Sequence, residues 1–124
     1  MAQGFTVNSV FLVGNLTRDP EVRFLPSGAP VARLSIAVKN RKKVGDEWVD
    51  DTCFIDVTGF GKRAEQVGEG LEKGMRIMVE GRLQYRSWEQ DGQKRSKHEV
   101  IADIIEKIER FGSKSSGREP GSND

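Results

Sequence analysis

The sequence predicts an all-β domain: a barrel of five strands, with one short helix between the third and fourth strands. Polar and apolar residues alternate in five runs, separated by turn residues, at residues 7–16, 31–39, 48–59, 76–88 and 97–110. One stretch with helical spacing lies between the third and fourth runs. Five strands with a single helix at that place is the order of the OB-fold.

The helix is expected at residues 62–73. Gly74 follows as the usual stop signal. The apolar residues of this segment fall on one stripe, which consists of Ala64, Val67 and Leu71. We expect the stripe to pack against one end of the barrel, because the helix is too weak to persist alone.

Two connections are predicted to be extended hairpins. Residues 89–93 contain an Asp-Gly turn signal between two long β-rich runs. Residues 41–51 form the second hairpin, with Lys42, Lys43 and Trp48 near its tip.

The domain boundary is expected near Phe111. The 124 residues suffice for one hydrophobic core, and residues 1–111 are predicted to form it. Residues 112–124 contain no apolar side chain and are predicted to be a disordered tail. No signal peptide or membrane span is expected, and the single cysteine, Cys53, fits a reducing compartment.

The formal net charge is only +1, so total charge does not indicate a nucleic-acid partner. The distribution over strand faces is more informative, because successive side chains of a strand point to opposite sides. The expected core sides hold Leu34, Ile36 and Val38, then Cys53, Ile55 and Val57, then Ile77, Val79, Leu83 and Tyr85. The opposite sides hold Arg33, Ser35 and Lys39, then Phe54, Asp56, Thr58 and Phe60, then Met78, Glu80, Arg82, Gln84, Arg86 and Trp88.

Three strands are thus expected to share one surface that carries both aromatic and basic residues. Unpaired bases stack on aromatic rings, and their phosphates attract Lys and Arg, so this pattern predicts binding of single strands. For each aromatic residue taken alone, packing is the competing explanation. In that case Phe60 covers the end of the helix, and Trp88 caps the hairpin. Trp48 is a weaker candidate for binding, because it lies near a predicted hairpin, where tip, core and interface positions are all open to it.

No catalytic or metal site is predicted. His98 is the sole histidine, which excludes a Ser-His-Asp triad or a multi-histidine metal site. Residues 59–62 superficially resemble a phosphate-binding loop but lack its glycine spacing. We therefore expect no enzymatic activity and no cofactor.

The first strand is apolar on both sides. Val10, Leu12 and Leu16 alternate there with Phe11 and Val13. One side fills the barrel, and a second subunit is the expected cover for the other.

Four segments in order resemble the bacterial single-stranded-DNA-binding protein family: NSVFLVGNLTRDPEVRFLPSGAPVARLSIAV, FGKRAE, LEKGMRIMVEGRL and RSWEQDGQ. The resemblance covers residues 8–108. It implies a homotetrameric OB-fold protein of the bacterial cytoplasm and nucleoid, which wraps single-stranded DNA without strong sequence preference during replication, recombination and repair.

The resemblance also implies roles for individual residues. Phe54, Phe60 and Trp88 fall on base-stacking positions. Lys62, Lys73, Arg86 and Arg23 fall on basic positions along the DNA path. Together with the face analysis, the predicted DNA-binding residues are Phe54, Phe60, Trp88, Arg23, Arg33, Lys39, Lys62, Lys73, Arg82 and Arg86.

The sequence departs from the family pattern at three places. Arg41 and Lys42 stand where many relatives carry a stacking tryptophan, and Asp56 stands at a position that is basic in well-known relatives. The acidic C-terminal tip ending Asp-Ile-Pro-Phe is absent, so partners among replication and repair enzymes are not carried over. The competing hypothesis keeps the fold and changes the ligand: a protein-interaction or primosome-like accessory subunit.

Overall fold

The structure is a computed structural model, and it describes residues 4–108. Its elements, in chain order, are β1 (Val10–Leu16), β2 (Glu21–Phe24), β3 (Pro30–Val44), β4 (Glu47–Phe60), α1 (Lys62–Gly70), β5 (Arg76–Gln90) and β6 (Gln93–Lys107).

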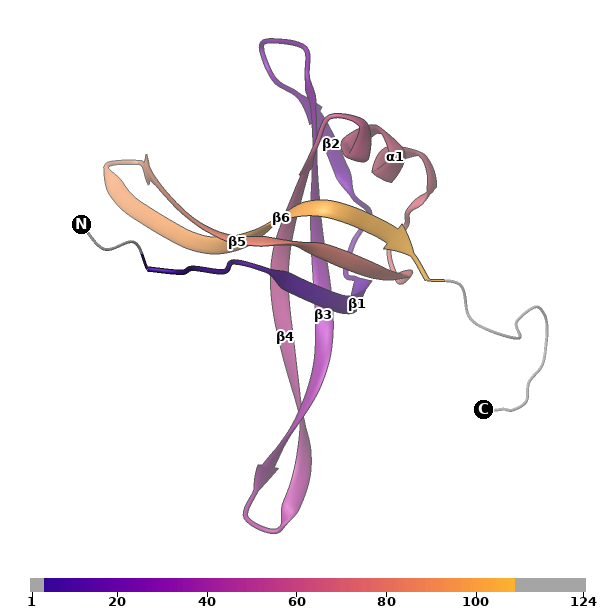
Figure 1. The fold of residues 1–124 in the computed structure, drawn as a ribbon, viewed down its shortest axis with the longest axis vertical. Coiled ribbons are helices and arrows are strands. Elements are labelled where there is room, and N and C mark those ends of the chain that lie inside the picture. Colours follow the sequence, from indigo (N-terminus) through magenta and orange to yellow (C-terminus); the bar gives the residue numbers. More distant parts are fainter. Residues whose placement is uncertain (1–3, 109–124) are drawn as a thin grey trace, which may run out of the picture.

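Five of the strands close into a barrel (Figure 1). The neighbours follow the order β1-β5-β6-β4-β3, and β1 pairs again with β3 through Asn15↔Ala37 and Leu16↔Ile36. The β4–β6 pair is parallel, and the other pairs of the ring are antiparallel. The predicted five-stranded OB-fold with one helix before the fourth strand of the ring is therefore confirmed.

The core fills the inside of this barrel. Its fully buried residues come from β1, β3, β4, β5, β6 and α1: Leu16, Ala32, Leu34, Ile36, Val57, Ala64, Val67, Ile77, Val79, Val100 and Ala102. Ala64 and Val67 of α1 pack against the barrel, as predicted. Gly68 faces Val22 of β2, where a Cβ atom would lie 3.0 Å from the Val22 Cγ2 atom, so this glycine permits a close approach of helix and strand.

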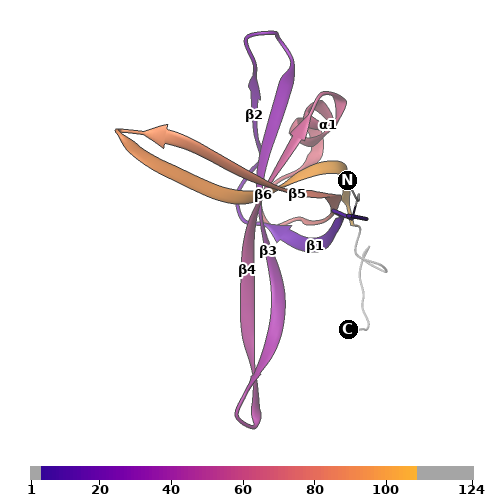
Figure 2. The same ribbon diagram turned by 60° about the vertical axis from the view of Figure 1, so that its left-hand side comes forward.

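Two hairpins project from the barrel in different directions (Figure 2). The β3–β4 arm turns at Gly45, which has φ 63°, and the β5–β6 arm turns at Asp91 and Gly92, with φ 53° and 78°. Two consecutive left-handed residues are what a type I′ turn requires, and Asp-Gly is a preferred pair for it. Both predicted hairpins are present, and Trp48 lies opposite Lys43 near the tip of the first.

The element bounds correct the sequence prediction in two respects. Helix α1 ends at Gly70 rather than at residue 73, because the glycine-rich end has low helix propensity and Leu71 is extended. Leu71 still packs against the core, so the stripe is kept without the last helical turn. Strand β2 was not predicted: it pairs with β3 outside the barrel ring.

The predicted burial was wrong at several strand positions. Leu83 and Tyr85 point to the core side of β5, yet they are 43% and 59% exposed because they lie on the projecting arm. Cys53 is likewise exposed, on the other arm. In contrast, Ser35 and Thr58 were assigned to the outer surface and are buried.

The expected domain boundary near Phe111 and the predicted tail at residues 112–124 lie outside the described residues. Within residues 4–108, no helix has the length and apolar character needed to cross a membrane.

Candidate nucleic-acid interface

Two phenylalanines lie on the outer side of β4. Phe54 is paired with Ala37 and Phe60 with Val31, and residues directly opposite in antiparallel strands share a face. Phe54 is 69% exposed and Phe60 is 47% exposed. Six residues of extended strand separate them by about 20 Å, a span over which several unpaired bases would fit.

Basic side chains from β2 and β3 lie on the same side. Arg23 is paired with Val31, which is in turn paired with Phe60, so these three residues form one row across the sheet. Arg33 is paired with Thr58, and Lys39 is paired with Thr52. Arg23 forms an ion pair with Glu21 at 2.8 Å, and both side chains are solvent-exposed. Arg33 and Lys39 form no ion pair with any residue in the described part of the chain.

A second group projects from β5 and contains Arg82, Arg86 and Trp88. Arg82 lies 3.8 Å from the Asp103 carboxylate, in an exposed pair. The Arg86 guanidinium carbon lies 4.6 Å from the centroid of the Trp88 ring, within the range of a cation–π contact. Trp88 is partly buried.

Side-chain contacts join the two groups. Lys97 donates to Asp56 Oδ2 at 2.7 Å, which links β6 to β4. Glu99 of β6 accepts from Thr58 Oγ1 of β4 at 3.2 Å and from Arg86 Nε of β5 at 3.0 Å. Glu99 is 4% exposed, so its charge is compensated inside the structure.

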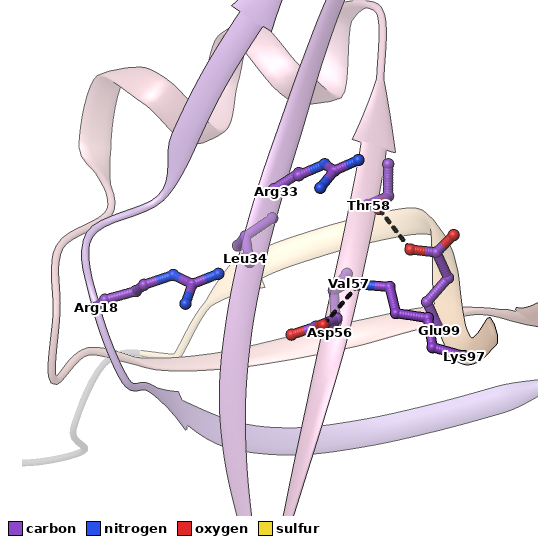
Figure 3. A pocket seen from close by; sticks show the side chains of 8 residues that line it. All are labelled: Arg18, Arg33, Leu34, Asp56, Val57, Thr58, Lys97 and Glu99. Atoms are coloured by element: carbon purple, nitrogen blue, oxygen red, sulfur yellow. Dashed lines mark hydrogen bonds and ion pairs between the residues drawn. The ribbon is translucent and has the colours of Figure 1, made fainter. Parts of the chain in front are cut away.

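A small polar pocket opens beside these contacts. Its lining combines basic and acidic side chains with strand residues: Arg18, Arg33, Leu34, Asp56, Val57, Thr58, Lys97 and Glu99 (Figure 3). The charge of Asp56, at a position that departs from the family pattern, is thus matched by Lys97.

The structure separates the two remaining predicted residues. Lys62 begins α1, two residues after Phe60, and is exposed, so it extends the first group. Lys73 lies in the loop that leads to β5, and its backbone N–H donates to Asp19 Oδ1 at 2.8 Å. No strand pairing aligns Lys73 with the aromatic residues.

Sequence reasoning missed three charged residues of this region: Arg18, Lys97 and Glu99. Continuing the strand alternation into the last run would have found Lys97 and Glu99, since both lie opposite predicted outer-face residues of β5, Arg86 and Gln84. Arg18 follows the end of β1, so no period-two pattern marks it.

The arrangement suits the binding of a single strand. Among residues 4–108 no group of three or more His, Cys, Asp or Glu side chains is placed to hold a metal ion. Exposed rings and cations on one face offer stacking and phosphate neutralisation, which are the two interactions that a single strand needs.

Comparison with known proteins agrees with this geometry. Residues 7–109 match the model of a family described as "Single-strand binding protein family". The single-stranded DNA-binding proteins of Wolinella succinogenes and Treponema pallidum are 47% and 42% identical to the chain over 90% and 81% of its length. The chain spans 70% of the first of these relatives and 57% of the second.

Solved structures show the same fold. The wild-type single-stranded DNA binding protein from Thermus aquaticus superposes with a TM-score of 0.75 at 38% identity, covering 85% of this chain and 52% of that one. A Plasmodium falciparum protein, solved in complex with single-stranded DNA, superposes with a TM-score of 0.78 over 87% of this chain and 100% of its own. At 21% identity, this second likeness concerns the fold alone. The chain belongs to the single-strand binding protein family, a family of DNA-binding proteins that are not enzymes.

Proposed function

We propose that this chain binds single-stranded DNA without strong sequence preference, on the outer face of β3, β4 and β5. Bases would stack on Phe54, Phe60 and Trp88, while Lys and Arg side chains neutralise the phosphates. Family membership and the relatives named single-stranded DNA-binding protein support this proposal.

The observation that carries the proposal is the exposure of Phe54 and Phe60 on a face that also bears cations. These rings contribute little to the core in their present positions. Stacking on every base is possible because each base has a π-face, which accounts for the lack of sequence preference.

Apart from Arg86, which is paired with the buried Glu99, the predicted basic residues divide into two classes. Arg33, Lys39, Lys62 and Lys73 have no ion pair among the described residues and are our candidates for direct phosphate contact. Arg23 and Arg82 are paired with exposed carboxylates. Such pairs are weak in water, so a phosphate can compete for either arginine at low cost.

We further infer that the protein assembles into a homotetramer and acts in DNA replication, recombination and repair in the bacterial cytoplasm, at the nucleoid. Support for self-assembly comes from β1, where Phe11 is 63% exposed and Val13 is 38% exposed on the outside of the barrel. Cross-strand pairing brings Met78 and Ile104 to the same outer side. An apolar face of this kind favours burial against further copies of the chain.

The test is a titration with a dT oligomer, followed by tryptophan emission at low salt, with duplex DNA as the control. We expect saturable quenching by the oligomer and much weaker binding of the duplex. Absence of quenching together with absence of a mobility shift would contradict the proposal and favour the protein-interaction hypothesis.

A further inference from the structure

We propose that Arg86 and Glu99 act as positioning residues for the Trp88 ring, and that Arg86 serves DNA binding through this ring rather than through a phosphate. The inference rests on the proposed function, because it concerns how one of its stacking residues is held. It also separates Arg86 from the other basic residues of the face.

The anchor of this arrangement is Glu99. A carboxylate that is 4% exposed is costly unless charged and polar partners surround it. Thr58 donates to one carboxylate oxygen at 3.2 Å, and the Arg86 Nε–H group donates to the other at 3.0 Å. The two partners come from β4 and β5, so Glu99 fixes Arg86 relative to the rigid barrel.

Arg86 transmits this constraint to Trp88. Its guanidinium carbon lies 4.6 Å from the ring centroid, and both residues are on the same side of β5. The Arg86 side chain is 33% exposed, compared with 74% for Arg23 and 52% for Arg82 in their ion pairs. Of these three arginines, Arg86 is the most shielded from solvent and from a passing phosphate.

The position of Trp88 explains why such a support is useful. The residue lies on the projecting β5–β6 arm, where Arg95 is its cross-strand neighbour and no residue of β5 from Arg82 onward is buried. A guanidinium against one ring face limits the ring to one orientation and leaves the other face for a base. A ring ordered before binding loses less conformational entropy when the base stacks.

The proposal predicts an effect opposite to that of simple electrostatics. Glu99→Gln removes a negative charge close to the binding face, which by itself would strengthen attraction for DNA. We expect it instead to weaken dT-oligomer affinity by roughly threefold to tenfold, part of the effect of losing one stacked base. Asp56→Asn is the matched control: it removes the same charge from the same face, frees Lys97, and should leave affinity equal or higher.

The experiment uses a Trp48→Phe parent, in which Trp88 is the only tryptophan. Affinity, its salt dependence and acrylamide quenching of Trp88 are measured for the parent, Glu99→Gln, Asp56→Asn and Arg86→Gln. Arg86→Gln should weaken binding with an unchanged salt slope and make free Trp88 more accessible to acrylamide. The Arg86→Gln measurements decide between the two outcomes if Glu99→Gln fails to fold.

Two results would overturn the inference. One is a Glu99→Gln protein that binds as tightly as Asp56→Asn. The other is an Arg86→Gln protein whose salt slope falls by about 0.7, the loss of one phosphate contact, while its Trp88 quenching is unchanged. Failure of the parent itself to bind the oligomer would instead refute the proposed function, so the two failures are distinguishable.

Discussion

At the scale of single residues, the face is organised by how well each charge is shielded from water. Arg23 and Arg82 have exposed carboxylate partners, while Glu99 is buried and holds Arg86. Strand alternation predicted the outer position of Phe54, Phe60, Arg33 and Arg86. It did not predict the burial of Thr58 and Glu99, since that depends on the contact of β4 with β6, whose residues Thr58 and Glu99 lie 41 positions apart in the sequence.

Replacing Phe60 with Ala tests the role of an exposed ring. We expect dT-oligomer affinity to fall by ~1–3 kcal/mol, the usual contribution of one stacked base. The melting temperature should change little, because the side chain is 47% exposed and leaves no large cavity.

Phe24→Ala is the control for this change. Phe24 is 69% exposed but alternates with Arg23 on β2, so it points away from the Phe60 row. Its replacement should leave affinity unchanged. Equal loss of affinity in both variants would show that the chosen face is not specific.

At the scale of elements, the sequence predicts a strand where side chains alternate between the core and the surface. It does not show where along that strand the packing against the core ends. The strands of the barrel follow from alternation, and the turn of the β5–β6 arm follows from its Asp-Gly signal. Alternation continues through Leu83 and Tyr85, however, so it does not reveal that the barrel ends and a two-stranded arm begins. Strand β2 escaped prediction because it has four residues, of which Val22 alone is partly buried.

Closure of the barrel gives a prediction about stability. A Cβ atom at Gly14 would lie 2.6 Å from the Ala37 carbonyl oxygen, at the β1–β3 contact that closes the ring. Gly14→Ala should therefore destabilise the protein by ~1–3 kcal/mol, as overpacking does. Urea unfolding at a fixed protein concentration measures the change.

Gly70→Ala serves as the control, since nothing lies within 4 Å of its added methyl group at the end of α1. It should leave stability equal or slightly higher because alanine is the better helix former. A stable Gly14→Ala protein would mean that β1 and β3 are not closely apposed.

At the scale of the whole molecule, the barrel presents two distinct exposed surfaces. One is the face of Phe54, Phe60 and Trp88. The other is the outer side of β1 and of the first residues of β5, where Phe11 is paired with Glu80 and Val13 with Met78. Alternation in the first strand predicted this second surface, whereas the number of copies that cover it follows only from the family resemblance.

Phe11→Asp tests this second surface. A charge placed in an apolar interface cannot be desolvated without cost, so the assembly should dissociate. Light scattering on a sizing column should give the mass of four chains for the parent and a smaller mass for the variant. Phe24→Asp, at an exposed phenylalanine elsewhere, should keep the parent mass; a monomeric parent would contradict the proposed tetramer.

On this account, the aromatic and the basic residues of one face bind a single strand by different interactions. The most direct test measures dT-oligomer affinity across a salt series for the parent, Phe54→Ala and Lys39→Gln. Phe54→Ala should lower affinity equally at every salt concentration, because stacking releases no counterions. Lys39→Gln should reduce the slope of log affinity against log salt by about 0.7, the contribution of one neutralised phosphate. Parallel lines with unchanged affinity for both variants would contradict the claim.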